Sequence, residues 1–118
     1  MKTSELSGAA LDWAVAKCAF PDLVWGETIG LSAHARGLIV IPDRKTPDCY
    51  WQPSTNWAQG GAIIEREHIC LMYYPTHWSA LAETGQRHSR GATPLEAAMR
   101  CYVASKMGDE VHLPEGLK

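Results

Sequence analysis

The chain has 118 residues, of which 46% are hydrophobic and 20% are charged, and its formal net charge is -2. This length and composition are typical of one globular domain, and we expect a single domain over residues 1–118. The net charge gives no reason to expect duplex DNA or an anionic membrane as a partner. The sequence has no apolar run near the roughly 20 residues of a membrane span and no signal-peptide core, which predicts a cytoplasmic protein.

The first predicted helix covers residues 4–18. Leu11, Val15 and Cys18 recur on one helical face, with further apolar residues beside it, which indicates a buried helix. Pro21 cannot continue the helix, and the residue before a proline avoids helical backbone angles. The helix is therefore expected to end before this proline.

The central predicted strand is the β-rich run at residues 38–41, with residues 23–25 as a neighbour. Two further strands are expected at residues 69–74 and 77–82, joined by a turn that contains a proline. Residues 83–92 are rich in polar side chains and are predicted to form a loop.

A second helix is predicted at residues 56–67. Ser54 or Thr55 is expected to cap its start, and Trp57 is expected in its core-facing stripe. The pair Gly60–Gly61 costs about 1 kcal/mol per glycine in a helix. Either the helix is kinked there, or another segment packs against the bare backbone.

The last helix has the clearest local signals in the chain. Thr93 is the expected N-cap, Pro94 occupies the first helical position, and Glu96 completes a capping box. Lys106 lies in the last turn, where a cation complements the helix dipole, and Gly108 is the expected C-cap.

The predicted order is helix, strand, helix, two strands and helix. This order favours an α+β fold, in which a small and mostly antiparallel sheet carries helices on its faces, as in an α-β-α sandwich. A short strand is expected at residues 111–113, and the tail at 114–118 is expected to fray.

The cysteines are scattered, with no CxxC pair, at positions 18, 49, 70 and 101. Structural zinc sites use such local pairs, so the pattern favours reduced and mostly buried thiols. We therefore expect neither a metal site nor a cofactor.

Three segments resemble the NinX family of tailed phages, small proteins encoded by lambdoid phages and prophages. They are SELSGAALDWAVAKC, YWQPSTNWAQGGAIIERE and TPLEAAMRCYVASKMGDEV, which together span most of the chain. A looser similarity links the same segments to the phage ABA-sandwich domain, although Asn56 stands where that pattern has an acidic residue. The resemblance implies an α+β sandwich, phage origin and action in the host bacterial cytoplasm. It brings no catalytic motif.

The loop RHSRGAT, which precedes the last helix, is one candidate binding site. A helix N-terminus attracts phosphate, and Arg87 and Arg90 can add charge-assisted bonds, while Ser89 or Thr93 can add a hydroxyl. The alternative is a solvated basic loop in which Thr93 is fully used as the helix cap.

The second candidate is the aromatic set Tyr50, Trp51 and Trp57, which can stack on a base or another flat ligand. The alternative is that these rings fill the core between helix and sheet. If the aromatic set and the basic loop meet in space, they form a nucleotide pocket.

The sequence favours a non-enzymatic phage accessory protein that binds a small anionic or nucleotide-like ligand during host takeover or counter-defence. The first alternative is an interaction module that binds a host protein through exposed aromatics. The second is a small hydrolase, although no HExxH run or nucleophile elbow is present. A homodimer is compatible with the first two readings.

Overall fold

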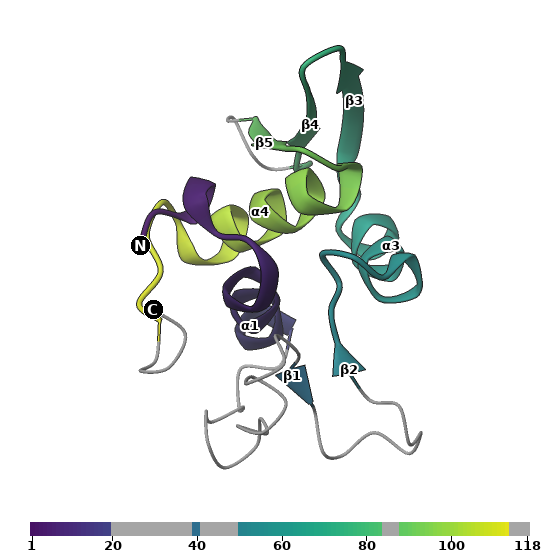
Figure 1. The fold of residues 1–118 in the computed structure, drawn as a ribbon. Helices are drawn as coiled ribbons and strands as arrows, with labels where there is room; N and C mark the ends of the chain where they lie inside the picture. The colour runs from purple at the N-terminus through teal and green to yellow at the C-terminus, as the bar shows by residue number, and fades with distance from the viewer. Residues whose placement is uncertain (20–38, 41–49, 84–87, 114–118) are drawn as a thin grey trace.

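A computed structural model describes residues 1–19, 39–40, 50–83 and 88–113. In chain order its elements are the 3-10 helix η1 (Thr3–Glu5), α1 (Gly8–Ala19), β1 (Ile39–Val40), β2 (Tyr50–Trp51), α3 (Trp57–Glu67), β3 (Cys70–Tyr74), β4 (His77–Leu81), β5 (Ser89–Gly91) and α4 (Pro94–Met107) (Figure 1). They form a small α+β fold with a three-stranded antiparallel sheet, which confirms the predicted fold class. Within the described ranges, no helix is long and apolar enough to cross a membrane.

Helix α4 is the central element. The sheet packs on one side of it, and α1 and α3 pack on the other (Figure 1). Its predicted caps are confirmed, because the Thr93 hydroxyl accepts the Glu96 N–H at 3.1 Å and Gly108 closes the helix at φ 83°. Its buried residues are Leu95, Ala97, Ala98, Met99, Cys101, Tyr102 and Val103. Each large apolar side chain among them contributes roughly 1.5–3 kcal/mol when fully buried.

The sheet has the order β3-β4-β5. Strands β3 and β4 form the predicted hairpin, with Tyr74 opposite His77 at the turn. The prediction of a loop throughout residues 83–92 is wrong, because Ser89–Gly91 pairs with β4 as β5. Polar side chains do not prevent a short segment from pairing along one of its edges. Gly91 permits it, since a Cβ there would lie 2.4 Å from the backbone nitrogen of Ala97 in α4.

Helix α3 confirms the predicted helix at residues 56–67, but its cap is Asn56 rather than Ser54 or Thr55. The Asn56 side chain accepts the N–H of the second helical residue at 2.9 Å. Another segment packs against the backbone at Gly60, which is the second of the two predicted alternatives. A Cβ there would lie 2.4 Å from the Pro53 carbonyl oxygen.

Trp57 is not a core residue, and that expectation is wrong. Its side chain is 56% exposed, because the buried face of α3 is centred on Gly60 and Ile63, and Trp57 lies beside that face in the first turn. Trp51, in contrast, is buried, and its indole N–H donates to the backbone carbonyl of Asp12 at 3.0 Å.

Tyr50 and Trp51 form strand β2, which pairs antiparallel with β1. Strand β1 lies within the predicted strand at residues 38–41. Backbone pairing with a distant segment overrides the turn residues that flank this pair. The predicted neighbouring strand at residues 23–25 lies outside the described residues.

The two ends of the described chain are bound to each other. Thr3 donates its backbone N–H to Asp109 at 2.8 Å and its hydroxyl to the Gly108 carbonyl at 2.6 Å. Met1 and Val111 also exchange bonds, so the predicted strand at 111–113 is replaced by a single bridge between Lys2 and Glu110. Helix α1 begins at Gly8, later than predicted, because η1 occupies the preceding turn. The tail at 114–118 lies outside the described residues.

Three cysteines lie within the described residues, and all are free. Burial raises the pKa of the Cys18 thiol to about 11 and also raises the pKa of Cys101, which disfavours the reactive thiolate form of both. Cys70 is exposed, in contrast to the expectation of mostly buried thiols. Cys49 lies outside the described residues.

Candidate functional site

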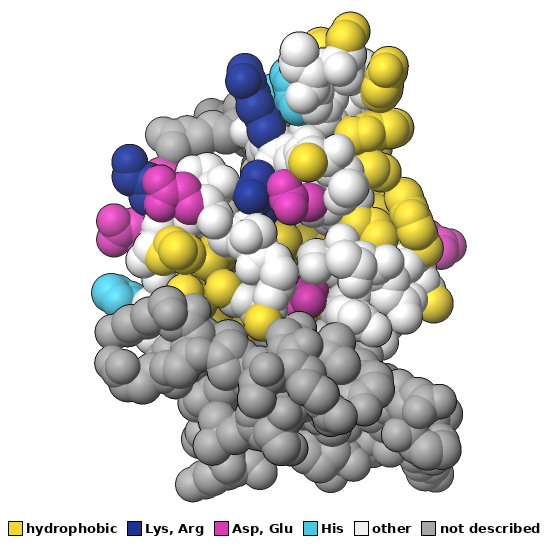
Figure 2. Space-filling model, viewed as in Figure 1, with side chains coloured by type: hydrophobic (Ala, Val, Ile, Leu, Met, Phe, Trp, Pro, Cys, Tyr) yellow, Lys and Arg dark blue, Asp and Glu magenta, His cyan; other side chains and the backbone are white. Residues whose placement is uncertain are grey.

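A groove of about 860 Å³ lies between the N-terminal segment, β5 and the C-terminal half of α4. Most of its lining residues have polar or charged side chains; they are Lys2, Thr3, Ser4, Ala82, His88, Ser89, Arg90, Arg100, Cys101, Ala104, Ser105, Asp109 and Glu110. Figure 2 shows basic and acidic side chains gathered over these elements, while apolar side chains gather along the hairpin and α3. The groove is therefore a charged surface.

Arg100 is a structural clamp in this groove. Its Nε donates to the Leu6 carbonyl at 2.8 Å, and its Nη1 donates to the Arg90 carbonyl at 2.8 Å. The same Nη1 lies 3.3 Å from the Glu96 carboxylate. The guanidinium thus joins the N-terminal segment to β5, and its charge is largely used inside the protein.

Lys2 and Arg90 are the cations that the fold leaves available. Both are exposed, and among the described residues neither side chain forms an ion pair. His88 lies beside them, with its Nδ1 3.1 Å from the hydroxyl of Ser79. Asp109 and Glu110 add carboxylates to the same groove. Cationic and anionic groups therefore line one concave surface.

The predicted anion-binding residues are only partly brought together. Ser89 and Arg90 line the groove. Thr93 lies at the start of α4 and is used as the N-cap, as the alternative reading of that loop required. Arg87 lies outside the described residues.

Neither Trp51 nor Trp57 of the predicted aromatic set lines this groove. Trp51 is buried against Asp12, and Trp57 is exposed on α3. Tyr50 belongs to β2, on the opposite side of α4 from the sheet, and its side chain lies outside the described set (Figure 1). The described aromatic residues of the set and the basic residues therefore form separate surfaces.

Sequence reasoning missed the contribution of Lys2, His88 and Arg100 to the groove. No local motif marks these three residues. Lys2, for example, is far from Arg90 in the chain and reaches the same groove only because the two ends of the described chain are bonded to each other. The sequence signal that pointed to the groove was the basic segment RHSRGAT before α4.

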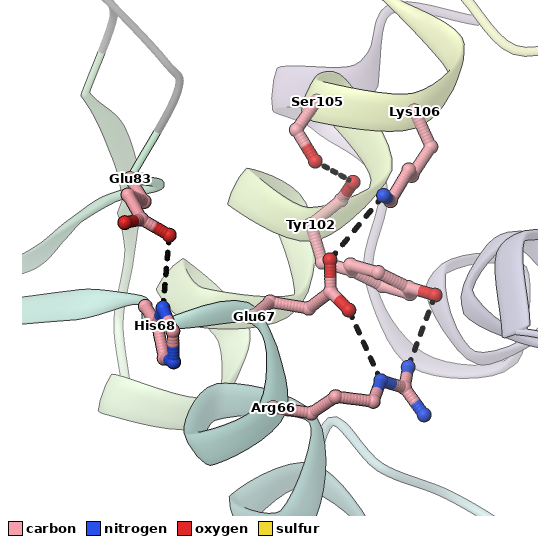
Figure 3. Close-up of polar contacts among 7 residues, drawn as sticks. All are labelled: Arg66, Glu67, His68, Glu83, Tyr102, Ser105 and Lys106. Atoms are coloured by element: carbon pink, nitrogen blue, oxygen red, sulfur yellow. Dashed lines mark hydrogen bonds and ion pairs between the residues drawn. The ribbon is translucent and has the colours of Figure 1, made fainter.

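A second hollow of about 210 Å³ lies between the C-terminal end of α3, the segment that follows β4 and the last turn of α4. His68 Nδ1 is 2.8 Å from the Glu83 carboxylate at its rim (Figure 3). The pair resembles part of a hydrolytic triad, but the nearby Ser105 hydroxyl donates to the Tyr102 carbonyl at 2.7 Å. The side chains of His68 and Glu83 are 68% and 67% exposed, so they lack the water-excluding setting of a catalytic dyad.

Glu67 organises the rest of that hollow as an ion-pair network. Its carboxylate accepts from Arg66 Nε at 3.0 Å and lies 3.3 Å from Lys106 Nζ (Figure 3). The bond from Arg66 lowers the pKa of Glu67. Arg66 also donates to the Tyr102 hydroxyl at 3.3 Å. These contacts join α3 to α4, so the network is structural. Among the described residues, no cluster of His, Cys, Asp and Glu could hold a metal ion.

The sequence model of the family described as Bacteriophage P22, NinX matches residues 2–106. No curated protein matches the chain. The matched range contains every helix and strand of the described structure except the last residue of α4.

Proposed function

Because the chain belongs to the bacteriophage P22 NinX family and is thus a phage accessory protein, we propose that it acts by binding a small anionic ligand in the host cytoplasm. The ligand occupies the groove beside β5. The observation that carries this proposal is the meeting of Lys2 and Arg90, two cations without ion-pair partners among the described residues, in one polar groove.

Arg90 is the main contact for the anion. A guanidinium presents a planar fork of donors that matches two oxygens of a phosphate or carboxylate. The Ser89 hydroxyl and the exposed Lys2 ammonium supply further donors on the groove wall. Arg100 holds the wall in place through its bonds to the carbonyls of Leu6 and Arg90.

The Glu110 carboxylate restricts the class of ligand. It repels a ligand whose negative charge is spread over its length, but it accepts hydrogen bonds from hydroxyl or amino groups. The proposed ligand therefore carries phosphate at one end and hydrogen-bond donors at the other, as a nucleotide does. Among the residues that the structure describes, no Phe, Tyr or Trp side chain lines the groove.

The test is isothermal titration calorimetry with AMP and inorganic pyrophosphate as probes. Arg90→Ala is expected to weaken binding at least tenfold, because one desolvated charge-assisted pair is worth roughly 1.5–3 kcal/mol. Arg66→Ala is the matched control, since it also removes one exposed arginine but lies on α3, outside the groove.

Unchanged affinity in Arg90→Ala, or an equal loss in Arg66→Ala, would contradict the site. Failure of the unmodified protein to bind AMP, or tighter binding of pyrophosphate, whose charge is spread over its length, would contradict the ligand class. Circular dichroism of both variants checks that the fold is intact.

A further inference from the structure

The outer edge of β3 is one of the two edges of the three-stranded sheet. β3 is an edge strand of the sheet, and among the described residues no backbone hydrogen bond leaves Cys70–Tyr74 other than within the sheet. Unpaired N–H and C=O groups along such an edge form a template for another strand. Proteins usually guard these edges by charge, proline, bulges or short length.

The two edges of this sheet differ in this protection. β5 is three residues long and carries the exposed Arg90. β3 is five residues long, with the sequence CLMYY, and contains no charge and no proline. Its residues are also strong strand formers on average. β3 is therefore suited to pairing, and β5 is not.

The aromatic side chains of the hairpin are exposed and already ordered. Tyr73 is 69% exposed and packs edge-on against Trp78, with ring centroids 5.3 Å apart. Tyr74 is 44% exposed and stacks on His77, with centroids 4.9 Å apart. Rings held in this way lose little entropy when a partner covers them. The apolar side chains continue from the hairpin along α3, so the exposed surface is long enough for an extended partner (Figure 2).

We propose that β3 pairs antiparallel with β3 of a second copy of this chain, which joins two three-stranded sheets into one of six strands. The two-fold axis lies at Met72. Leu71 then lies opposite Tyr73 of the second copy, and Cys70 lies opposite Tyr74. Each cross-strand pair is apolar on both sides, and such pairs contribute roughly 0.2–1 kcal/mol each.

A second copy is the favoured partner because a strand that pairs with this edge should be extended and uncharged. β3 is such a segment, and its symmetric pairing brings no like charges together. The hairpin also projects beyond α4, so the edge extends away from the body of the molecule (Figure 1). This pairing is independent of the groove, which lies at β5.

Light scattering after size exclusion tests the dimer. The unmodified protein is expected at twice its chain mass of 13.0 kDa. Met72→Lys and Met72→Glu are each expected to be monomers, because like charges would face each other across the axis. Their mixture is expected to restore the dimer, since Lys then faces Glu. Met72 is outside the hydrophobic core, so both variants are expected to fold.

Disulfide trapping tests the register, in a Cys70→Ser background. Met72→Cys is expected to form a covalent dimer on mild oxidation, because facing residues in an antiparallel pair lie about 4.5–5.5 Å apart. Thr76→Cys at the exposed turn is the control. Its two copies would lie at opposite ends of the paired strands, beyond the reach of a disulfide, so it is expected to remain monomeric on a denaturing gel. Equal trapping of both variants would contradict the register. If the unmodified protein is monomeric at a concentration of about 100 µM, the proposed dimer is wrong, and the edge is left to a different partner.

Discussion

Edge strand β5 has three residues and carries the exposed Arg90, whereas edge strand β3 has five residues and no charge. One helix, α4, supports both strands. The β5 edge lies in a polar groove, and the β3 edge lies on an aromatic hairpin. The comparison teaches that the side chains and length of an edge strand decide its possible partners. The first edge suits a small charged ligand, and the second suits another strand.

The largest expected effect comes from Gly91→Ala, which would separate β5 from α4. The added Cβ would lie 2.4 Å from the Ala97 backbone nitrogen and 2.9 Å from the Glu96 carbonyl carbon, so the backbone itself must shift. We expect a loss of about 3 kcal/mol in the free energy of unfolding, measured by urea denaturation.

Gly61→Ala is the control for that variant. Its Cβ would meet only the Trp57 ring at 3.8 Å, and alanine favours a helix over glycine by about 1 kcal/mol. This variant is therefore expected to be more stable than the unmodified protein. Similar stabilities for the two alanine variants would show that β5 does not depend on close contact with α4.

The next effect concerns Asp12 on α1, away from both edges. Burial raises the pKa of its carboxyl from 3.8 to about 6, although the Ser54 N–H, which donates to Oδ1 at 2.9 Å, opposes the shift. The folded state therefore holds the proton more tightly than the unfolded chain. The protonated Asp12 carboxyl therefore contributes fully to the free energy of unfolding below about pH 4, and this contribution is lost as the pH rises through about 6.

Asp12→Asn is expected to remove this dependence, because the amide oxygen can still accept the Ser54 N–H and carries no charge. At pH 7.5 we expect the variant to be more stable by about 2–3 kcal/mol, and at pH 4 we expect no difference. Urea denaturation at both values measures the change. A constant difference between the two proteins at both pH values would contradict the assignment to Asp12.

The smallest effect on stability is expected from the two variants that test the β5 edge and the β3 edge independently. Arg90→Ala and Met72→Lys each change a side chain outside the core, so each should alter the free energy of unfolding by less than about 0.5 kcal/mol. Arg90→Ala should lose ligand and keep the dimer, and Met72→Lys should do the reverse. Loss of both properties in either variant would show that the two edges are coupled.

Local signals predicted α4 well, because its caps are short-range interactions. Thr93 and Glu96 lie within one turn, and their bond forms whatever the rest of the fold does. The same reasoning placed α3 to within one residue. It failed at Trp57, because exposure depends on which helical face meets α4, and that is decided by the close contact of Gly60 with Pro53.

The groove could not be predicted in full, because distant segments build it. Ser89 and Arg90 were found from the basic loop, but strand β5 depends on pairing with β4. Lys2 reaches the groove only because Thr3 is bonded to Asp109. The aromatic residues that the structure exposes most on the sheet, Tyr73 and Tyr74, read in the sequence as an ordinary strand. Pattern alone does not distinguish an edge strand from a central one.

Native mass spectrometry of protein purified gently from its bacterial host tests the account most directly, because it reports oligomeric state and retained ligand together. We expect the mass of a dimer plus roughly a few hundred daltons per chain, which is comparable to the mass of a nucleotide. The excess should disappear in Arg90→Ala while the dimer remains. An excess that survives in Arg90→Ala, or a monomer without any excess, would contradict the account.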